Sequence, residues 1–346
     1  IGVRLVGSEM CIRDRSGLVT GFLSLLLFRA IMGLAEGPIL PLSQSLMVEA
    51  SSPHRRGLNM GLLQGSAAGL LGAVIGPPVL IALAEAYGWR HAFIISLIPG
   101  LLIALLIWRY VQPDPPRHEP RAHTPSSPGG SHRLALLKSR NIVLCTLISC
   151  VFLTWFIILI SFTPTFLVKV RDYSPASMGT VMSCLGGAWV LWGFGVPAIS
   201  DRLGRRPTLV LFSLIAACCP IALLYASSPW MLGVLMLLTY TGLGCFTLFM
   251  ATIPAETVPR EVMATALGMI MGIGELVGGF IAPTIAGFAA DRFGLSIVMW
   301  MSCGGALLAA VLALFLKETA PAVLARQQRR HPGPNPAPSP SLGGNP

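Results

Sequence analysis

The stretch Ser200-Asp201-Arg202-Leu203-Gly204-Arg205-Arg206-Pro207 is a short basic segment between two long apolar runs, residues 178–199 and 208–226. A helix needs about 20 mostly apolar residues to cross the hydrocarbon core of a bilayer. Both runs have that length, whereas the segment between them is too polar to lie in lipid. The pattern predicts a tight turn between two membrane helices.

Outward from this turn the chain shows the same pattern along most of its 346 residues. Only 11% of the residues are charged, against about 25% in soluble domains. A β-barrel would need alternating segments of about 10 residues, which these runs do not show. We therefore predict an all-α integral membrane protein with nine spans: residues 22–48, 58–84, 92–108, 142–168, 178–199, 208–226, 231–253, 263–290 and 295–316.

The connecting loops predict the orientation, because cytoplasmic loops collect Lys and Arg. Alternate loops hold sixteen such residues on one side, including Arg202, Arg205 and Arg206, and four on the other. The C-terminal tail is therefore expected in the cytoplasm. The net charge of +10 then reflects topology and contact with membrane lipids, and no nucleic-acid partner is predicted. The cysteines have no metal-ligand spacing, and no metal or cofactor is expected.

A Pro-rich segment divides the chain, and we interpret residues 112–140 as a cytoplasmic linker. Three predicted spans precede it and six follow. Shifting the sequence by 206 residues pairs Pro53 with Pro259, Pro77 with Pro283, Glu85 with Asp291 and Gly88 with Gly294. The first run thus corresponds to the fourth helix of a six-helix half, so three of twelve helices are expected to precede this chain. The predicted parts are a non-native leader (1–15), helices four to six (16–111), a complete second half (141–317) and a disordered cytoplasmic tail (318–346).

The first run carries the most informative charges, Arg29 and Glu36. A charge at the bilayer centre costs about 3 kcal/mol or more, so it needs a partner or a wet cavity. The two residues are seven apart and share one helical face with Gly33, where a substrate or another backbone can approach. An interhelical ion pair with small-residue packing is the alternative interpretation.

Glu275 lies in the middle of the run 263–290, among glycines. An unpaired carboxyl in a dry site suits a proton carrier, although the glycines fit tight packing equally well. Gln64 and Tyr240 are further candidates to line a cavity, while aromatic residues near helix ends also serve as interfacial anchors.

The loop 200–207 resembles the loop signature of the major facilitator superfamily, with Pro197 where the family has Gly. The resemblance implies a gate, in which Asp201 caps a helix N-terminus across the two halves and Arg202, Arg205 and Arg206 pair with carboxylates or headgroups. A plain positive turn is the alternative. Glu49 and Arg56 resemble the family's charge network after the fourth helix, but the second copy has Met263 in place of Arg.

Three further segments resemble the anion:cation symporter branch of that superfamily, whose members carry small organic anions with protons. They are the Arg29-x6-Glu36 helix, Gly72-x3-Gly76-Pro77-Pro78, and Tyr87-Gly88-Trp89-Arg90. The resemblance implies Arg29 as an anion-binding residue and Glu36 as a proton-coupling carboxylate. Gly76-Pro77 also partly resembles the antiporter motif of efflux members, so proton-driven efflux is the second possibility.

Other function classes lack their signatures. No loop gathers a His, Asp or Cys cluster typical of a membrane enzyme, no filter motif repeats as in a channel, and no phosphate-binding Gly-x4-Gly-Lys loop indicates ATP hydrolysis. The sequence therefore predicts an ion-driven transporter working by alternating access, monomeric and multi-pass in a bacterial inner membrane, with a small organic anion and protons as its partners.

Overall fold

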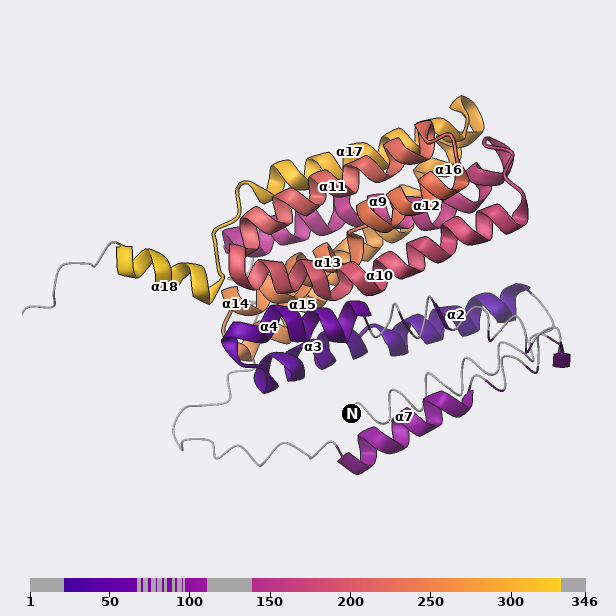
Figure 1. The fold of residues 1–346 in the computed structure, drawn as a ribbon. Coiled ribbons are helices and arrows are strands. Elements are labelled where there is room, and N and C mark those ends of the chain that lie inside the picture. Colours follow the sequence, from indigo (N-terminus) through magenta and orange to yellow (C-terminus); the bar gives the residue numbers. More distant parts are fainter. Residues whose placement is uncertain are drawn as a thin grey trace, which may run out of the picture.

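The computed structural model describes residues 22–66, 70, 74–75, 79, 83, 86–88, 91, 95, 97–110 and 139–330. Within these residues all regular elements are helical. The helices of the C-terminal part of the chain form a large bundle, and the N-terminal helices lie beneath it in Figure 1.

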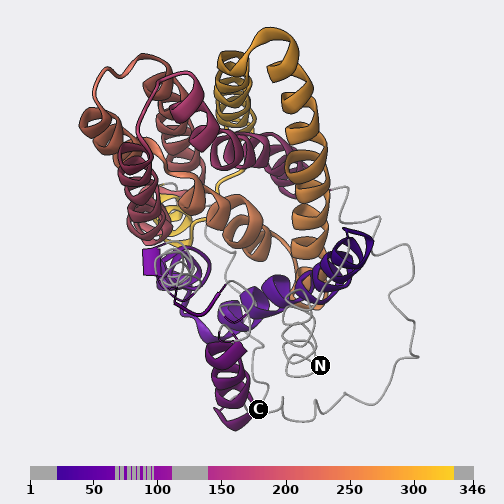
Figure 2. The same ribbon diagram turned by 90° about the vertical axis from the view of Figure 1, so that its right-hand side faces the viewer.

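Six helical segments of the C-terminal part are long and apolar enough to cross a membrane. The elements that build them are α9 (Arg140–Lys169), α10 (Pro175–Leu203), α11 (Arg205–Tyr225), α12 (Pro229–Thr239), α13 (Gly242–Phe246), η5 (Thr247–Thr252), α14 (Ile253–Thr257), α15 (Arg260–Gly274), η6 (Glu275–Ile281), α16 (Ala282–Phe293) and α17 (Leu295–Ala313). They match the last six predicted runs, and Figure 2 shows them as a bundle seen end-on.

The N-terminal part contains α2 (Phe22–Glu36), α3 (Ile39–Ala50), η2 (Pro53–Arg55), α4 (Arg56–Gly61), η3 (Leu62–Ser66) and α7 (Leu97–Tyr110). The predicted run 22–48 is not one helix, because a turn at Gly37 and Pro38 separates α2 from α3. Pro38 has no N–H to donate to the preceding turn, which explains the break. The run 58–84 lies partly outside the described residues, and α7 is too short to count as a span. The total of nine membrane spans therefore remains a prediction.

Two turns between helices require glycine. Gly204 has φ 113° between α10 and α11, and Gly294 has φ 82° between α16 and α17. Gly88, which the repeat pairs with Gly294, has φ 83°. A residue with a side chain is strained in this region, whereas glycine is not. The matching φ angles support the internal repeat that the 206-residue shift predicts.

Two π-helical stretches end two residues before a proline. The stretch η5 ends at Thr252 before Pro254, and η6 ends at Ile281 before Pro283. Ile75, two residues before Pro77, is also π-helical. Proline cannot donate the backbone hydrogen bond of a regular helix, and widened turns of this kind recur at functional sites. Ile75 and Ile281 are both π-helical, and the 206-residue shift of the repeat pairs them with each other.

An aromatic cluster lies within the largely aliphatic core of the large bundle. Trp155 packs against Phe152 and Tyr240 with ring centroids 5.0 and 4.9 Å apart, and its Nε1 donates to the Ala216 carbonyl at 3.0 Å. Gly305 lets α17 approach α9 closely, since an added Cβ would lie 2.7 Å from the Val151 carbonyl oxygen. These contacts fix the bundle that presents the polar network described below.

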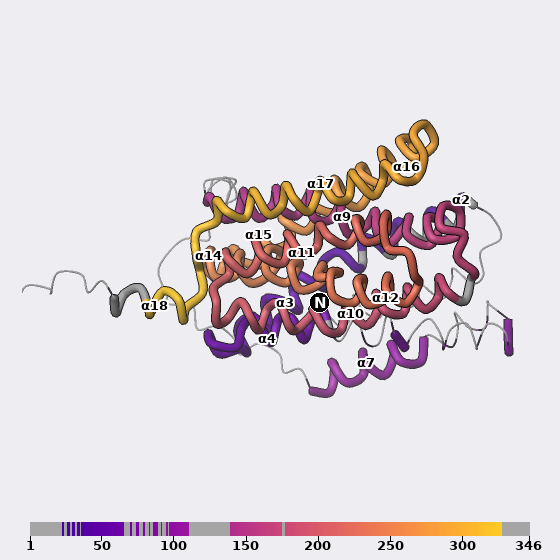
Figure 3. Tube along the Cα trace, turned by 45° about the horizontal axis from the view of Figure 1, so that its top comes forward, coloured from indigo at the N-terminus to yellow at the C-terminus, as the bar shows by residue number. Residues whose placement is uncertain are grey.

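Part of the C-terminal tail is also helical. The helix α18 (Pro321–Arg330) extends beyond the end of the bundle and contacts α10 and η2 (Figure 3). The expectation that residues 318–346 are disordered is therefore wrong for 321–330. Proline in the first turn and Ala, Leu, Gln and Arg after it favour a helix.

Candidate functional site

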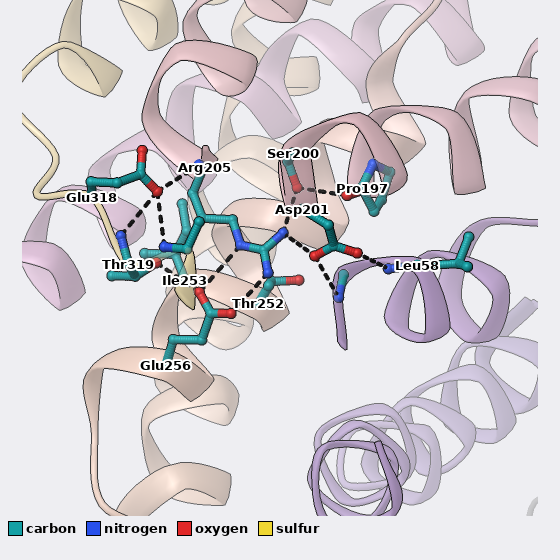
Figure 4. A network of polar contacts seen from close by, with 12 residues as sticks. Leu58, Pro197, Ser200, Asp201, Arg205, Thr252, Ile253, Glu256, Glu318 and Thr319 are labelled. Carbon is teal, nitrogen blue, oxygen red and sulfur yellow. Dashed lines mark hydrogen bonds and ion pairs between the residues drawn. The ribbon is translucent and has the colours of Figure 1, made fainter. Parts of the chain in front are cut away.

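Asp201, at the end of α10, contacts the N-terminus of α4 from the other part of the chain. The backbone N–H groups of Gly57 and Leu58 donate to its two carboxylate oxygens at 3.2 and 3.1 Å. A carboxylate at a helix N-terminus satisfies donors that have no partner within the helix and interacts favourably with the helix dipole. The structure thus contains the capping contact between the two parts of the chain that the sequence suggested for Asp201 (Figure 4).

Arg205 is the buried cation of this network, with only 1% of its side chain exposed. Its Nη1 lies 2.6 Å from Asp201 Oδ1 and donates to Ser200 Oγ at 2.6 Å. Its Nη2 and Nε donate to the two oxygens of Glu256 at 2.8 and 3.2 Å, which is a bidentate pair. Such forks fix geometry as well as charge. Arg205 therefore holds the ends of α10 and α14 together.

Glu318, just after the last spanning helix, caps α11. Its Oε1 accepts from the Arg205 N–H at 2.7 Å, and its Oε2 accepts from the Arg206 N–H at 3.1 Å. The neighbouring Thr319 donates from Oγ1 to Glu256 Oε2 at 2.7 Å. The segment leading to α18 is thereby tied to the same network (Figure 4).

The contact between α4 and α10, which we name the α4–α10 seam, is built from glycines that closely approach residues of α10. Gly57, Gly61 and Gly65 recur every fourth residue and face Asp201, Pro197 and Gly193, which recur at the same interval. A Cβ on Gly61 would lie 2.5 Å from the Gly193 carbonyl oxygen. The two helices run antiparallel along this seam, with almost no space between their backbones.

A second feature, the membrane groove, lies between α2–α3 and α15–η6. Its volume is about 1070 Å³, and Glu36, Glu275, Gly33, Gly37, Gly268 and Gly272 are among the residues that line it. Glu36 ends α2, and Glu275 begins the π-helical stretch η6. The sequence singled out both carboxyls separately, and the structure brings them to one groove. The Arg29 side chain lies outside the described part of the molecule.

The other predicted residues lie elsewhere. Gln64 accepts from the buried Gln44 Nε2 at 2.9 Å, between α3 and η3, and Tyr240 is fully buried in the aromatic core. Arg202 and Arg206 are exposed. Glu49 is exposed and Arg56 half-buried, and they form no ion pair in the described structure.

Sequence reasoning missed Glu256 and Glu318. Glu256 precedes Met263 by seven residues, as Glu49 precedes Arg56, and the Met263 mismatch in this second copy of the charge pattern hid it. Its partner is Arg205, 51 residues away, so spacing along one helix does not reveal the pair. The glycine pattern Gly57-x3-Gly61-x3-Gly65 was readable as a close-packing motif of membrane helices, and it marks the seam.

The known proteins that this chain resembles include several bacterial transporters. The hexuronate transporter of Bacillus subtilis is 26% identical over 86% of this chain and 73% of its own length. A probable 4-methylmuconolactone transporter of Cupriavidus pinatubonensis is 28% identical over 87% and 70%. Both relatives are described as transporters and neither as an enzyme.

Solved structures show the same fold. The human organic anion transporter TETRAN has a TM-score of 0.70 at 17% identity, covering 90% of this chain and 76% of its own. The Escherichia coli fucose:proton symporter FucP has a TM-score of 0.70 at 14% identity, covering 91% and 82%. This chain is accordingly a multi-pass membrane transporter and not an enzyme. The model of the Major Facilitator Superfamily matches residues 15–283, and the chain belongs to that superfamily.

Proposed function

We propose that this protein takes up a small organic anion together with protons by alternating access. The observation that carries the proposal is the membrane groove, where a carboxyl from each part of the chain, Glu36 and Glu275, lines one space. Glu275 is near the middle of the candidate span Arg260–Phe293, and Glu36 lies at the end of α2. Carboxyls inside a membrane are costly unless they are used, and proton relays are a common use.

The cytoplasmic network supports alternating access. Asp201 and the α4–α10 seam hold the cytoplasmic ends of the two parts together, so this conformation is closed on that side. Opening inward would break the two backbone hydrogen bonds to Asp201 and separate Gly57 from α10. In this proposal residues 16–111 and 141–317 are the rocking halves, residues 112–140 link them, and Glu49, Arg56, Arg202 and Arg206 complete the gate.

The substrate class is supported by the relatives. These relatives are named as transporters of hexuronate, cis,cis-muconate and 4-methylmuconolactone, which are carboxylates or derive from carboxylates. In this proposal Arg29 binds the anion, and Gly33, Gln64 and Tyr240 contribute to its site when the groove and the core rearrange. The protein then works as a monomer in a bacterial inner membrane with its C-terminus in the cytoplasm.

Transport assays with Glu36→Gln test the coupling. The purified protein is reconstituted in liposomes and supplied with labelled hexuronate or muconate under an imposed pH gradient. Gln imitates the protonated carboxyl, so counterflow exchange should persist while gradient-driven accumulation is lost. Arg29→Gln should lose both, and Lys should rescue poorly because it lacks the planar fork. Uptake restored in the Arg29→Gln, Glu36→Gln double variant would instead assign the two residues to a packing pair.

Proton-driven efflux is the second candidate. Multidrug resistance protein MdtG of Enterobacter lignolyticus is 24% identical over 90% of this chain. The same liposomes decide between the two directions: efflux predicts that substrate and protons move oppositely, so accumulation would require an acidic interior. Uptake predicts accumulation with an alkaline interior.

A further inference from the structure

A basic groove, distinct from the membrane groove, lies at the cytoplasmic end of the molecule. Its volume is about 780 Å³, and it is lined by His54, Arg55, Leu58, Ala198, Ile199, Asp201, Arg202, Ala322 and Arg326. These residues come from η2 and α4 on one part of the chain and from α10 and α18 on the other. The transport cycle proposed above uses Asp201 and Arg202 as gate residues but assigns no ligand to this space.

The charges in the basic groove are unbalanced. Arg55, Arg202 and Arg326 come from three elements, and none has an acidic side chain within ion-pair distance in the described part of the molecule. Asp201 is the one carboxylate in the lining, and its oxygens are already taken by Arg205, Gly57 and Leu58. Three like charges that face one space repel each other, and an anion between them would remove that repulsion.

The shape of the basic groove fits a compact, multiply charged anion. Ala322 and Arg326 are four residues apart, so they lie on one face of α18, and Leu58, Ala198, Ile199 and Ala322 give the wall an apolar part. Guanidinium groups match the geometry of phosphate through paired N–H donors. A phosphate also offers enough acceptor oxygens for several arginines at once.

We propose that the basic groove binds a phosphate-bearing anion, supplied either by the headgroup of an anionic phospholipid or by a soluble phosphate compound of the cytoplasm. The bound anion joins η2 to α10 and α18 and so adds to the Asp201 contact. It stabilises the conformation that is closed toward the cytoplasm, because His54 and Arg55 lie across the seam from Arg202 and Arg326.

Ligand-dependent melting of the purified full chain tests this proposal in two arms. Nanodiscs of phosphatidylcholine alone are compared with nanodiscs that also contain phosphatidylglycerol. Pyrophosphate is titrated into the phosphatidylcholine discs, with chloride at matched ionic strength as the reference. We expect a rise in Tm in at least one arm, and that arm identifies the source. The variant Arg55→Gln, Arg202→Gln, Arg326→Gln should bind the effective anion about tenfold more weakly or worse, equivalent to the loss of about 1.4 kcal/mol.

Arg260→Gln is the matched control, since Arg260 is exposed at the start of α15 and does not line the basic groove. It should respond to the anion as the unmodified chain does. If the triple variant does not fold, Ala322→Glu places a carboxylate in the groove on a helix outside the bundle and should also abolish the response. No anion-dependent rise in either arm overturns the proposal, and so does an equal response in the groove variants and the control.

Discussion

Arg205 is the central side chain of the polar network around Asp201, because it is buried and contacts two carboxylates at once. Placing charges in a poorly solvated site costs free energy that only good geometry recovers. The bidentate contact with Glu256 and the hydrogen bond to Ser200 supply that geometry. The neighbouring Arg206 is exposed and contributes its backbone N–H to the Glu318 cap.

We expect Arg205→Met to be strongly destabilising, since it leaves Asp201 and Glu256 without their cation. Removing one partner of a buried ion pair typically costs about 3–5 kcal/mol. Thermal unfolding in detergent measures the change, with Arg206→Gln as the matched control, which should stay close to the original Tm. If adding Glu256→Leu to Arg205→Met recovers no stability, the Arg205–Glu256 pair is not the source of the loss.

At the scale of elements, the α4–α10 seam depends on the absence of side chains. Gly61 and Gly65 meet the backbone of Gly193 directly, and Pro197 packs on Gly61. In lipid, helices associate through van der Waals packing and polar contacts, so close backbone approach is the main source of their association. A Gly→Ala substitution at the seam should therefore push α4 and α10 apart, whereas the same substitution at an open position should not.

Gly61→Ala and Gly304→Ala should have opposite effects on stability. Ala at Gly61 would place Cβ 2.5 Å from the Gly193 carbonyl oxygen, whereas nothing lies within 4 Å at Gly304 in α17. The intrinsic helix propensity of Ala favours both substitutions by about 1 kcal/mol, so only the clash distinguishes them. Melting temperatures of the two variants check this, and a stabilised Gly61→Ala would contradict the packing of the seam.

The second prediction at the scale of elements concerns the π-helical stretch η6 and Pro283, which follows it. Pro283→Ala restores a donor to the helix after η6, so that stretch should relax toward a regular α-helix and turn the Glu275 side chain about its axis. Amide hydrogen exchange across residues 275–283 should slow. Unchanged exchange would mean that Pro283 does not maintain the π-helical geometry.

For the whole molecule, the proposed transport cycle gives the seam and the Asp201 contact the role of closing one side of the membrane. Asp201→Asn keeps an acceptor for one backbone N–H but loses the charge that pairs with Arg205 and the α4 N-terminus. Spin labels at Ser52 and Arg260, both exposed and on opposite parts of the chain, should report an increased population at longer distance. Arg292→Gln, an exposed substitution in the last turn of α16 outside the proposed gate, should leave the distribution unchanged. An unchanged distribution in Asp201→Asn would exclude Asp201 from the gate.

Orientation is tested separately from gating. In a background without native cysteines, a Cys at Ser52 should react only with reagent that reaches the cytoplasm, and a Cys at Ser227 should react from outside, because the Lys and Arg excess lies on the Ser52 side. Labelling of Ser52 from outside would reverse the topology, and with it the side that the network closes.

The sequence by itself determined the class and much of the layout of this protein. Apolar runs of membrane length identify the six spanning segments from 140 to 313, since lipid permits few alternatives to a helix. The 206-residue repeat paired Gly88 with Gly294, and both adopt the same positive φ. The loop at 200–207 pointed to Asp201 because its charge and position are local properties of the chain.

Only the tertiary structure decided which distant residues meet. Arg205 pairs with Glu256 and Glu318 caps α11 because α10, α14 and the segment after α17 converge at one end of the bundle. Likewise, Glu36 and Glu275 share a groove because α3 packs against α15, which places the end of α2 and the start of η6 around one space. Periodicity shows which face of a helix is apolar, but not which helix packs against it. That choice rests on the fit of Gly57, Gly61 and Gly65 to α10, which depends on the shapes of both surfaces together.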